Sequence, residues 1–367
     1  MNLFSSATNS YLGVDIGASS IKLVELVNDR GRGRLVTYGY SELKNDNNAF
    51  DIQKDPEGRA ELIRAIIKKS GATSTAVVTA LPTYAVFSSV LTFPARLGKK
   101  ELPTAIRWEA KKVIPLPIDQ MILDWKPLIQ TEEEKEEKIL DSSEKKLDKK
   151  SPKRKFQKIL LTGAPKKLVQ KYVTVFKLAG LRLMSLETES FALVRSLIGN
   201  DPTPAMLVNF GAMTTTISVI EHAIPLLNRS IDIGGRNITK KIAYSLKISE
   251  DKASHFKQDV GIADLTLPNS KAPQIIVDAL EPVTSEIIYA KNIWQSQFGK
   301  SINKIVLTGG SANLPGLSDY LTKEIGIKTF LGDPWARVSY PEDLKPVLNE
   351  VGTKLSVALG LAMRNIE

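Results

Sequence analysis

The hydrophobic pattern at the start of the chain alternates between short apolar runs and segments of helical spacing. Residues 11–26, YLGVDIGASSIKLVEL, predict a strand, a tight turn of small residues and a second strand. Residues 55–72, DPEGRAELIRAIIKKSGA, carry apolar residues at helical spacing and end at a glycine. Residues 74–82 and 84–94 predict two further strands, each closed by a proline. This alternation predicts an α/β fold.

The pattern changes after residue 95. Apolar residues there recur at helical spacing before two prolines, and they predict a helix: Leu102, Ile106, Ala110 and Val113. Residues 121–129 predict a strand, and residues 156–165 predict its neighbour in a sheet. One helix and a few strands make a small α+β module. A helix over residues 166–181, ended by Gly180, then returns the chain to the α/β pattern.

Residues 131–158, TEEEKEEKILDSSEKKLDKKSPKRKFQK, are mostly charged and contain one aromatic residue, Phe156. Such a segment buries too little apolar surface to offset the entropy lost on ordering. We expect a mobile insertion, whose acidic first part and Lys-rich last part could pair as a charged hairpin. A solvated loop is favoured over a docking role.

The opening pattern returns at residue 206. MLVNFGAMTTTISVIE aligns with LGVDIGASSIKLVE so that Asn209 falls at Asp15 and Gly211 at Gly17. With two extra residues allowed in the second turn, we expect Ile217 to correspond to Ile21 and Glu221 to Glu25. The repeat predicts two lobes built alike by internal duplication.

Composition excludes several classes of function. The 367 residues carry a net charge of +10, but the lysines are scattered and no aromatic residues are interleaved with a basic run, so we expect no nucleic-acid binding. No apolar run is long enough for a membrane span, and the start has no signal-peptide pattern. There is no cysteine, and His222 and His255 have no metal-ligand spacing. A cytoplasmic protein without direct membrane insertion is expected.

Turns of glycine and hydroxyl residues are the candidate binding chemistry. Their backbone N–H groups can approach an anion closely, although one such turn alone is more typical of an ordinary hairpin. The strand Ile305–Thr308 ends in Gly309-Gly310-Ser311, where flat backbone could lie against a nucleoside. Gly234 and Gly235 precede a helix whose positive end could face phosphate. Two turns facing each other across a cleft could hold a polyphosphate.

These segments together resemble the actin-like ATPase superfamily. Within it, the chain is most similar to the PilM family of type IV pilus assembly, through DIGASSIKLVEL, VLTGGSANLPGL, VALGLAMR and especially ELPTAIRWEAKKVIPLPIDQMILDWKPL. The last stretch resembles a subdomain that the family shares with the division protein FtsA. The resemblance implies a two-lobed actin-like α/β fold with a small α+β subdomain inserted in the first lobe.

The implied domains follow the chain in order. They are the first lobe at residues 1–90, the inserted subdomain at 91–165 with the charged loop 131–158, a return to the first lobe at 166–204, the second lobe at 205–335, and a C-terminal helix returning to the first lobe at 336–367.

The resemblance also implies a site for ATP and Mg²⁺. Asp15 would orient the magnesium shell as metal residue and catalytic group, and Lys22 would lie nearby. The phosphates would lie between two turns, Gly17, Ala18, Ser19 and Ser20 in one and Gly211, Ala212, Met213, Thr214 and Thr215 in the other, with Gly234 and Gly235 adjacent. The adenosine would lie against Gly309, Gly310 and Ser311. Lys257 matches a ribose-side lysine of the family, although Ser254 replaces the glutamate that accompanies it.

Asn209 is the main departure from the family pattern, which has Asp in this catalytic position. An amide cannot become anionic and take a proton from water. We therefore expect nucleotide binding with weak or absent hydrolysis, and the question of enzymatic activity stays open.

The implied function is that of a cytoplasmic ATP-binding scaffold in type IV pilus assembly or a related type II secretion system. Its implied partner is the cytoplasmic tail of a PilN-like inner-membrane protein, bound in a groove between the first lobe and the inserted subdomain. Trp108 and Trp125 are candidate anchors there, although both are equally expected in the core of the module. The protein would be peripheral at the inner membrane through this partner. An FtsA-like division or filament protein is the alternative, and filament formation by self-association is left open.

Overall fold

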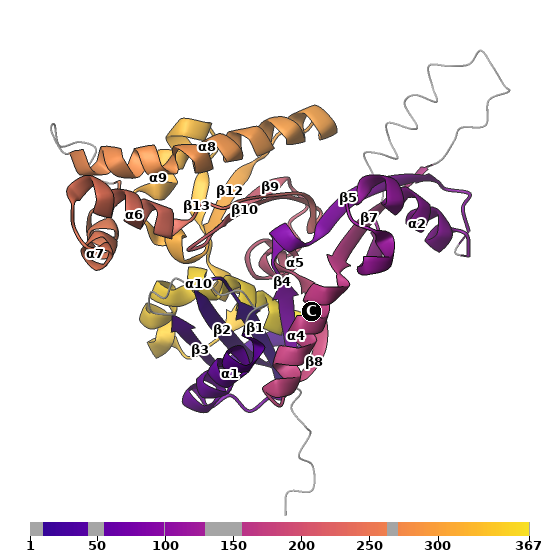
Figure 1. Cartoon of the computed structure of the whole chain (residues 1–367), viewed down its shortest axis with the longest axis horizontal. Helices are drawn as coiled ribbons and strands as arrows, with labels where there is room; N and C mark the ends of the chain where they lie inside the picture. The colour runs from indigo at the N-terminus through magenta and orange to yellow at the C-terminus, as the bar shows by residue number, and fades with distance from the viewer. Residues whose placement is uncertain (1–9, 43–54, 99, 129–155, 263–270, 367) are drawn as a thin grey trace, which may run out of the picture. The chain divides into compact units, whose positions relative to one another are not determined.

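The computed structural model describes residues 10–42, 55–98, 100–128, 156–262 and 271–366 (Figure 1). The chain forms two compact units, one from Met1–Tyr84 and Val169–Glu367 and the other from Ala85–Leu168. Residues 131–155 of the predicted mobile loop lie outside the described residues.

The first unit contains a six-stranded sheet with the strand order β14-β3-β2-β1-β4-β8. Its strands in chain order are β1 (Ser10–Ile16), β2 (Ser20–Asp29), β3 (Arg32–Glu42), β4 (Ala76–Leu81), β8 (Arg182–Thr188) and β14 (Val338–Ser339). β1, β2 and β3 are antiparallel neighbours, whereas β4 and β8 run parallel to β1. The opening hairpin is confirmed, but β3, of which only the first five residues alternate between exposed and buried, was not predicted.

Helices accompany this sheet in the order α1 (Pro56–Ser70), α4 (Lys166–Leu178), α5 (Glu189–Leu193) and α10 (Lys345–Met363). α1 is capped at its start by Asp55, whose carboxylate accepts the Gly58 N–H at 2.8 Å, and at its end by Gly71 in the left-handed conformation. α10 lies directly on β1, because a Cβ at Gly13 would stand 2.0 Å from the carbonyl oxygen of Ala358. Only glycine permits this approach.

The same unit contains a five-stranded sheet with the order β11-β10-β9-β12-β13. Its strands are β9 (Ala205–Phe210), β10 (Thr215–Glu221), β11 (Ile224–Ile231), β12 (Lys304–Thr308) and β13 (Thr329–Leu331). As in the first sheet, an antiparallel three-stranded meander is followed by two strands parallel to its first strand. The predicted duplication is confirmed by this repeated order.

The register of the two opening hairpins is also the same. The Gly17 N–H donates to the Ser20 carbonyl at 2.9 Å, and the Gly211 N–H donates to the Thr214 carbonyl at 3.0 Å. The two turns therefore have equal length, and the two extra residues expected in the second turn are wrong. Structurally, Ile217 corresponds to Leu23 and not to Ile21, so Glu221 does not correspond to Glu25.

Four helices belong to the second sheet: α6 (Gly235–Leu246), α7 (Glu250–Val260), α8 (Lys271–Phe298) and α9 (Leu317–Ile325) (Figure 1). Their apolar faces share one core with β9, β10 and β12, in which Trp294 is fully buried. Trp294 stacks on Phe298 with ring centroids 4.2 Å apart.

The second unit is a three-stranded antiparallel sheet in the order β5-β7-β6, with one long helix, α2 (Leu102–Val113). Its strands are β5 (Phe87–Pro94), β6 (Met121–Pro127) and β7 (Phe156–Pro165). The predicted helix and the neighbouring strands are confirmed. Residues 156–158 were included in the mobile loop, which is wrong, because they begin β7 and pair with Pro94, Phe93 and Thr92 of β5.

The two candidate anchor tryptophans differ in burial. Trp125 packs against the small core of the second unit, whereas Trp108 on α2 is 64% exposed with Lys111 over its ring.

Candidate functional site

The first candidate turn, Gly17–Ser20, holds a charged pair at its base. Asp15 and Lys22 are cross-strand neighbours on β1 and β2, and the Lys22 ammonium donates to Asp15 Oδ2 at 2.9 Å. Asp15 is buried and Lys22 is mostly buried. Ala18 and Ser19 form the tip of the turn. Within the described residues, no hydrogen bond engages their N–H groups, so these donors can receive an anion.

Glu189 is a functional candidate that sequence reasoning missed. Burial raises the pKa of its carboxyl to about 8, the Asp15 carboxylate adds to the rise, and Lys22 and a backbone hydrogen bond from Thr83 oppose it. Glu189 directly follows β8, Thr83 follows β4, and Asp15 lies near the end of β1. Because carboxyl ends of parallel strands meet at one sheet edge, that position was the signal that could have found Glu189.

Two more groups belong to this carboxyl cluster. The Thr83 hydroxyl is buried without a hydrogen-bond partner among the described residues. Burial raises the pKa of the Tyr172 phenol well above its usual value, and the charges of Glu189 and Asp15 add to this rise. Asp15 thus lies among largely buried groups, so electrostatic interactions there are stronger than at the surface.

The second candidate turn, Gly211–Thr214, has the same backbone but different chemistry at its base. Asn209 takes the position of Asp15, and its cross-strand neighbour Thr216 takes that of Lys22. The Thr215 hydroxyl is fully buried and donates to the Ile233 carbonyl at 2.6 Å, so this predicted phosphate donor holds the turn instead. Within the described residues, the N–H groups of Ala212 and Met213 at the tip have no hydrogen-bond acceptor.

The start of α6 supports the second turn from behind. The N–H groups of Gly235 and Arg236 donate to the carbonyls of Gly211 at 3.0 Å and Ala212 at 2.9 Å. A Cβ at Gly234 would stand 2.5 Å from the Ala212 carbonyl oxygen, so the contact requires glycine. These helix amides, which were expected to face phosphate, are engaged by the turn. Their contribution is to fix its shape.

The Gly309-Gly310-Ser311 turn contacts the second candidate turn. The Ser311 hydroxyl donates to the Gly211 carbonyl at 2.9 Å. Gly309 has φ +90° and leaves no room for a side chain, since a Cβ would stand 2.7 Å from Asn209 Oδ1. Gly310 is exposed and open on its Cβ side, where the first atom met is Cγ of Lys354 at 3.6 Å. Accessible backbone at Gly310 therefore lies beside the second turn.

Lys257 on α7 completes the second cluster. Its ammonium donates to the Gly235 carbonyl at 3.0 Å and to the Thr239 hydroxyl at 2.8 Å, and burial lowers its pKa. The predicted residues of the second lobe are thus brought together around one turn, and those of the first lobe around another.

α10 contacts both clusters of predicted site residues, the one around the first turn and the one around the second. It lies on β1 at Gly13, and its Thr353 carbonyl accepts the Gly309 N–H at 3.1 Å. The Ser356 hydroxyl accepts a hydrogen bond from the Thr308 hydroxyl at 2.8 Å. One helix therefore contacts the strand that carries Asp15 and the turn expected to flank adenosine.

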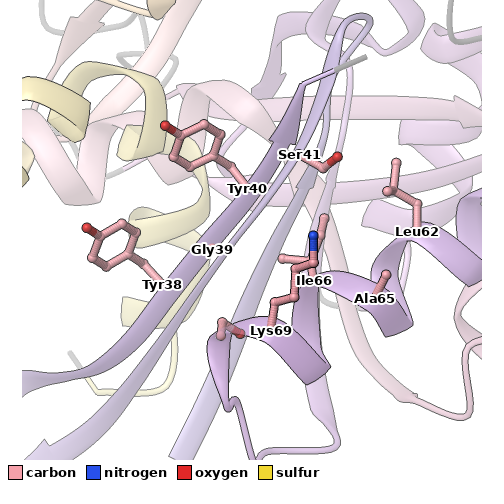
Figure 2. Close-up of a pocket in the computed structure, with 9 residues that line it drawn as sticks. Tyr38, Gly39, Tyr40, Ser41, Leu62, Ala65, Ile66 and Lys69 are labelled. Carbon is pink, nitrogen blue, oxygen red and sulfur yellow. The ribbon is translucent and has the colours of Figure 1, made fainter. Parts of the chain in front are cut away.

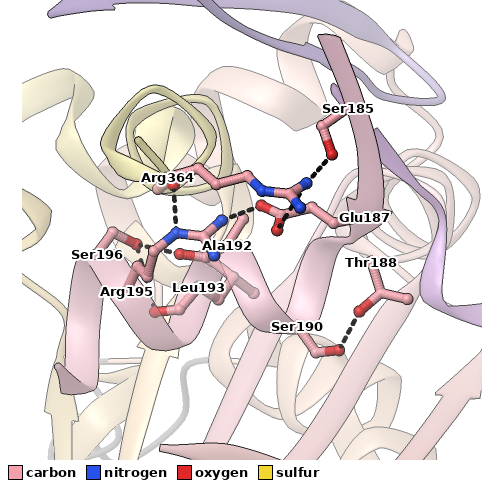
Figure 3. Close-up of polar contacts among 10 residues, drawn as sticks. Ser185, Glu187, Thr188, Ser190, Ala192, Leu193, Arg195, Ser196 and Arg364 are labelled. Carbon is pink, nitrogen blue, oxygen red and sulfur yellow. Dashed lines mark hydrogen bonds and ion pairs between the residues drawn. The ribbon is translucent and has the colours of Figure 1, made fainter. Parts of the chain in front are cut away.

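A second charged group, around Glu187, ties three elements together (Figure 3). Glu187 on β8 pairs with Arg195 of the π-helix η3 (Val194–Ile198) and with Arg364 after α10, and Arg195 also donates to the Gly360 carbonyl at 2.8 Å. Burial raises the pKa of Glu187, whereas the two guanidinium groups oppose this rise. The group holds the end of β8, and with it the position from which Glu189 extends.

The residues present fit a magnesium nucleotide. Mg²⁺ in phosphate sites uses few protein carboxylates and keeps several waters, and Asp15 has a carboxylate oxygen that Lys22 does not engage. No group of three or more His, Cys, Asp or Glu side chains able to hold a metal by themselves occurs among the described residues. Any metal would depend on the phosphates for most of its non-water ligands.

A separate cavity of about 230 Å³ lies between β3 and α1 (Figure 2). Its walls include Gly39, Ser41, Ile66 and Lys69, and none of the predicted site residues lines it.

Over the part of the chain that the structure describes, no helix is both long and apolar enough to cross a membrane.

Comparison with known proteins identifies relatives. A family model described as type IV pilus assembly protein PilM matches residues 13–366. The cell division protein FtsA of Enterococcus hirae is 28% identical over 197 residues, which cover 48% of this chain and 44% of that protein. The chain thus spans less than half the length of this curated relative.

Two solved structures show the fold. The structure of a PilM-PilN type IV pilus biogenesis complex has a TM-score of 0.80 and 24% identity, covering 98% of this chain and 99% of that chain. MreB5 of Spiroplasma citri bound to ADP has a TM-score of 0.51 and 12% identity, covering 96% and 95%. The expected actin-like ATPase fold is confirmed by these likenesses.

Proposed function

Because the chain belongs to the family of type IV pilus assembly protein PilM, we propose that it is an ATP-binding scaffold of pilus assembly. The observation that carries the nucleotide site is the pair of hairpins in identical register, each with engaged backbone at its base and two N–H donors at its tip. ATP would lie with its phosphates between these tips and its adenosine against Gly309 and Gly310. MreB5, a protein of similar fold, is bound to ADP in its solved structure, which supports a nucleotide as the ligand.

Different protein groups would bind different parts of the phosphate chain and its metal. The tip amides of both turns would hold phosphate oxygens, and Lys22 would add a cation. A bound Mg²⁺, oriented through Asp15, would neutralise phosphate charge. Asn209 could orient a water but not deprotonate it.

Glu189 is the group that we assign as proton acceptor for a water attacking the terminal phosphate. Its pKa of about 8 means that the carboxyl is mostly protonated at neutral pH. Hydrolysis should then be slow near neutrality and rise as the pH increases through this value. Near neutral pH hydrolysis is therefore weak, and Glu189 takes the role that Asn209 cannot fill.

Binding is tested by the thermal stability of the full chain with ATP and Mg²⁺. Ligand at about 100 times its dissociation constant should add roughly 2.7 kcal/mol to the stability. Gly310→Asp should abolish the shift by placing charge on the adenosine surface, whereas Gly98→Ala in the second unit is a matched control, because the first atom that its Cβ would meet is 3.9 Å away. An unchanged melting temperature of wild type with saturating ATP would exclude the nucleotide site.

The proposed partner is the cytoplasmic tail of a PilN-like inner-membrane protein, in line with the PilM-PilN complex of similar fold. Its tail would dock on the second unit beside α2, and would hold the protein peripherally at the inner membrane. Exposed Trp108 is the anchor that we propose for an apolar side chain of the tail. The family match favours this function over that of an FtsA-like division protein.

Peptide binding tests this part of the proposal. A synthetic tail should bind wild type in calorimetry, and Trp108→Ala should weaken binding by about 10-fold or more, as expected for a truncated aromatic anchor. Trp125→Phe, a mild change to a side chain packed in the core, is the control. Equal affinity for the Trp108 variant and wild type would exclude Trp108 as an anchor.

A further inference from the structure

The outer edge of β3 is paired over only part of its length. β14 runs parallel to β3 and pairs with it at Gly33 and Arg34. Beyond these residues no described strand lies on the outer side of β3, although its other side pairs with β2 as far as Glu42. The stretch from Thr37 to Glu42 contains neither proline nor lysine, which proteins often place on sheet edges to prevent further pairing. Among the described residues, this stretch is therefore an open edge.

The alternation of hydrogen bonds shows which backbone groups of β3 face outward. The Gly17 N–H donates to the Ser20 carbonyl, so Ser20 and every second residue of β2 after it direct their backbone groups to β1. The residues between them bond to β3, where their partners are Thr37, Gly39 and Ser41. The residues of β3 whose N–H and C=O groups point away from β2 are therefore Tyr38, Tyr40 and Glu42. This row of donors and acceptors matches the backbone of one further extended strand.

The cavity between β3 and α1 borders the same stretch of β3 (Figure 2). At Gly39, a Cβ would stand 2.8 Å from Cγ2 of Ile66, so the Cβ side of this glycine faces α1. Tyr38 and Tyr40 point to the opposite face of the strand, where Tyr38 contacts Trp335 (Figure 2). Because β3 directs only small side chains to the α1 side, it does not fill the cavity.

The size and lining of the cavity fit side chains of a peptide. Pockets for small molecules usually hold about 300–1,000 Å³, and this cavity, at about 230 Å³, is smaller. Its wall on α1 consists of the apolar side chains of Leu62, Ala65 and Ile66, together with the exposed Lys69. In a strand paired with β3, every second side chain would point toward α1 and into this space. Apolar side chains would be buried there, and an acidic one would meet Lys69.

We propose that this edge binds an extended peptide segment of a partner protein, which adds one strand beside β3 and packs alternate apolar side chains against α1. The surface lies in the first unit, so it is separate from the one proposed for the PilN-like tail in the second unit. A second copy of this chain fits the edge less well. Paired antiparallel through the same edge, it would offer the cavity only Thr37, Gly39 and Ser41.

A synthetic peptide pool tests the proposal on the full chain. Its members have the pattern Thr-X-Thr-X-Thr-X-Thr, in which each X is Val, Leu, Phe or Glu. The member that binds most tightly is identified by mass spectrometry, resynthesised, and used as the probe in calorimetry. We expect saturable binding of one peptide per chain. A pool in which no member binds with a dissociation constant below about 1 mM would overturn the inference.

Amide hydrogen exchange reports where the probe binds. In the free chain labelled with ¹⁵N-tyrosine, the outward N–H groups of Tyr38 and Tyr40 should exchange fast, and saturating probe should slow both by about 10-fold or more. Bound probe that leaves both rates unchanged would overturn the inference. Slow exchange before the probe is added would show that a second copy or the chain itself already covers the edge, and would overturn it as well.

Two matched pairs of variants test the edge and the cavity separately. Tyr40→Pro removes an outward N–H without removing a bond to β2, and should weaken binding of the probe by about 10-fold or more, whereas Tyr40→Val keeps the N–H and should bind nearly as wild type does. Ala65→Trp fills the cavity and should weaken binding to a similar extent. Lys68→Trp places the same side chain on an exposed position of α1 that does not line the cavity, and should have no effect.

The second pair of variants does not alter β3, so it tests the proposal even if Tyr40→Pro fails to fold. Equal affinity of Ala65→Trp and Lys68→Trp for the probe would overturn the inference, because the peptide side chains would then not enter the cavity.

Discussion

Replacing Glu189 by glutamine should change how the stability of the protein depends on pH. A carboxyl whose pKa rises from 4.5 in the unfolded chain to about 8 in the folded protein binds more protons when folded between these values. Stability from this group is therefore present at low pH and is lost as pH rises through about 8. The glutamine side chain would be neutral throughout and would keep an oxygen for the Thr83 backbone hydrogen bond.

The size of the effect follows from the shift. Each unit of pKa difference corresponds to about 1.4 kcal/mol. Between about pH 5.5 and 8, the free energy of unfolding of wild type should fall relative to that of Glu189→Gln by roughly 3 kcal/mol. Other titrating groups are common to both proteins and cancel in the difference.

Urea denaturation in EDTA without nucleotide measures this difference. In a Trp108→Phe, Trp125→Phe background, fluorescence reports only the first unit, through the buried Trp294 and Trp335. Asp201→Asn is the control. Its pKa shift is opposite in direction to that of Glu189, because hydrogen bonds from Lys304 and Thr203 lower the pKa of Asp201 to about 2. Its stabilisation is lost only as pH falls through that value, so its effect should be constant across the range used.

A pH-independent difference between Glu189→Gln and wild type would refute the reasoning. It would mean that the Glu189 carboxyl titrates normally, and that water or a cation reaches it in the folded protein.

Three further expectations follow from the structure. Asn209→Asp should raise the rate of ATP hydrolysis without tightening ATP binding more than a few-fold, and steady-state kinetics in which the rate is unchanged would show that this position does not act on water. Replacing residues 131–155 by a short Gly-Ser linker, with β7 kept intact, should leave the melting temperature and ATP binding unchanged, whereas a large fall in melting temperature would show that the segment packs on the body. Gly13→Ala should destabilise the protein by more than about 4 kcal/mol in urea denaturation, because its Cβ would stand 2.0 Å from the Ala358 carbonyl oxygen, and near-wild-type stability would contradict the close approach of α10 to β1.

Much of the fold could be predicted from local pattern. The helix Leu102–Val113 was predicted from its spacing and prolines, and the paired hairpins from glycine and hydroxyl turns. β3 was missed because its two glycines and three charged residues suggest a loop. The extra residues assigned to the second turn came from matching Ile217 to Ile21 by type, whereas backbone hydrogen bonds fix the register.

The candidate site was less accessible from sequence, because its chemistry depends on what each group already contacts. Glu189 is far in sequence from Asp15, and only the sheet order brings the two strand ends together. Sequence could not show that Thr215 and the first amides of α6 are engaged inside the protein. Tertiary hydrogen bonds therefore divided the predicted residues into those that hold the turns and those that face a ligand.

The central claim is most directly tested by a crystal structure of the full chain with a non-hydrolysable ATP analogue and Mg²⁺. We expect phosphate oxygens within hydrogen-bond distance of the tip amides of both turns, Ala18 and Ser19 on one side and Ala212 and Met213 on the other, with adenine against Gly310. A nucleotide bound elsewhere, such as in the cavity between β3 and α1, or phosphates held by one turn alone, would contradict this claim.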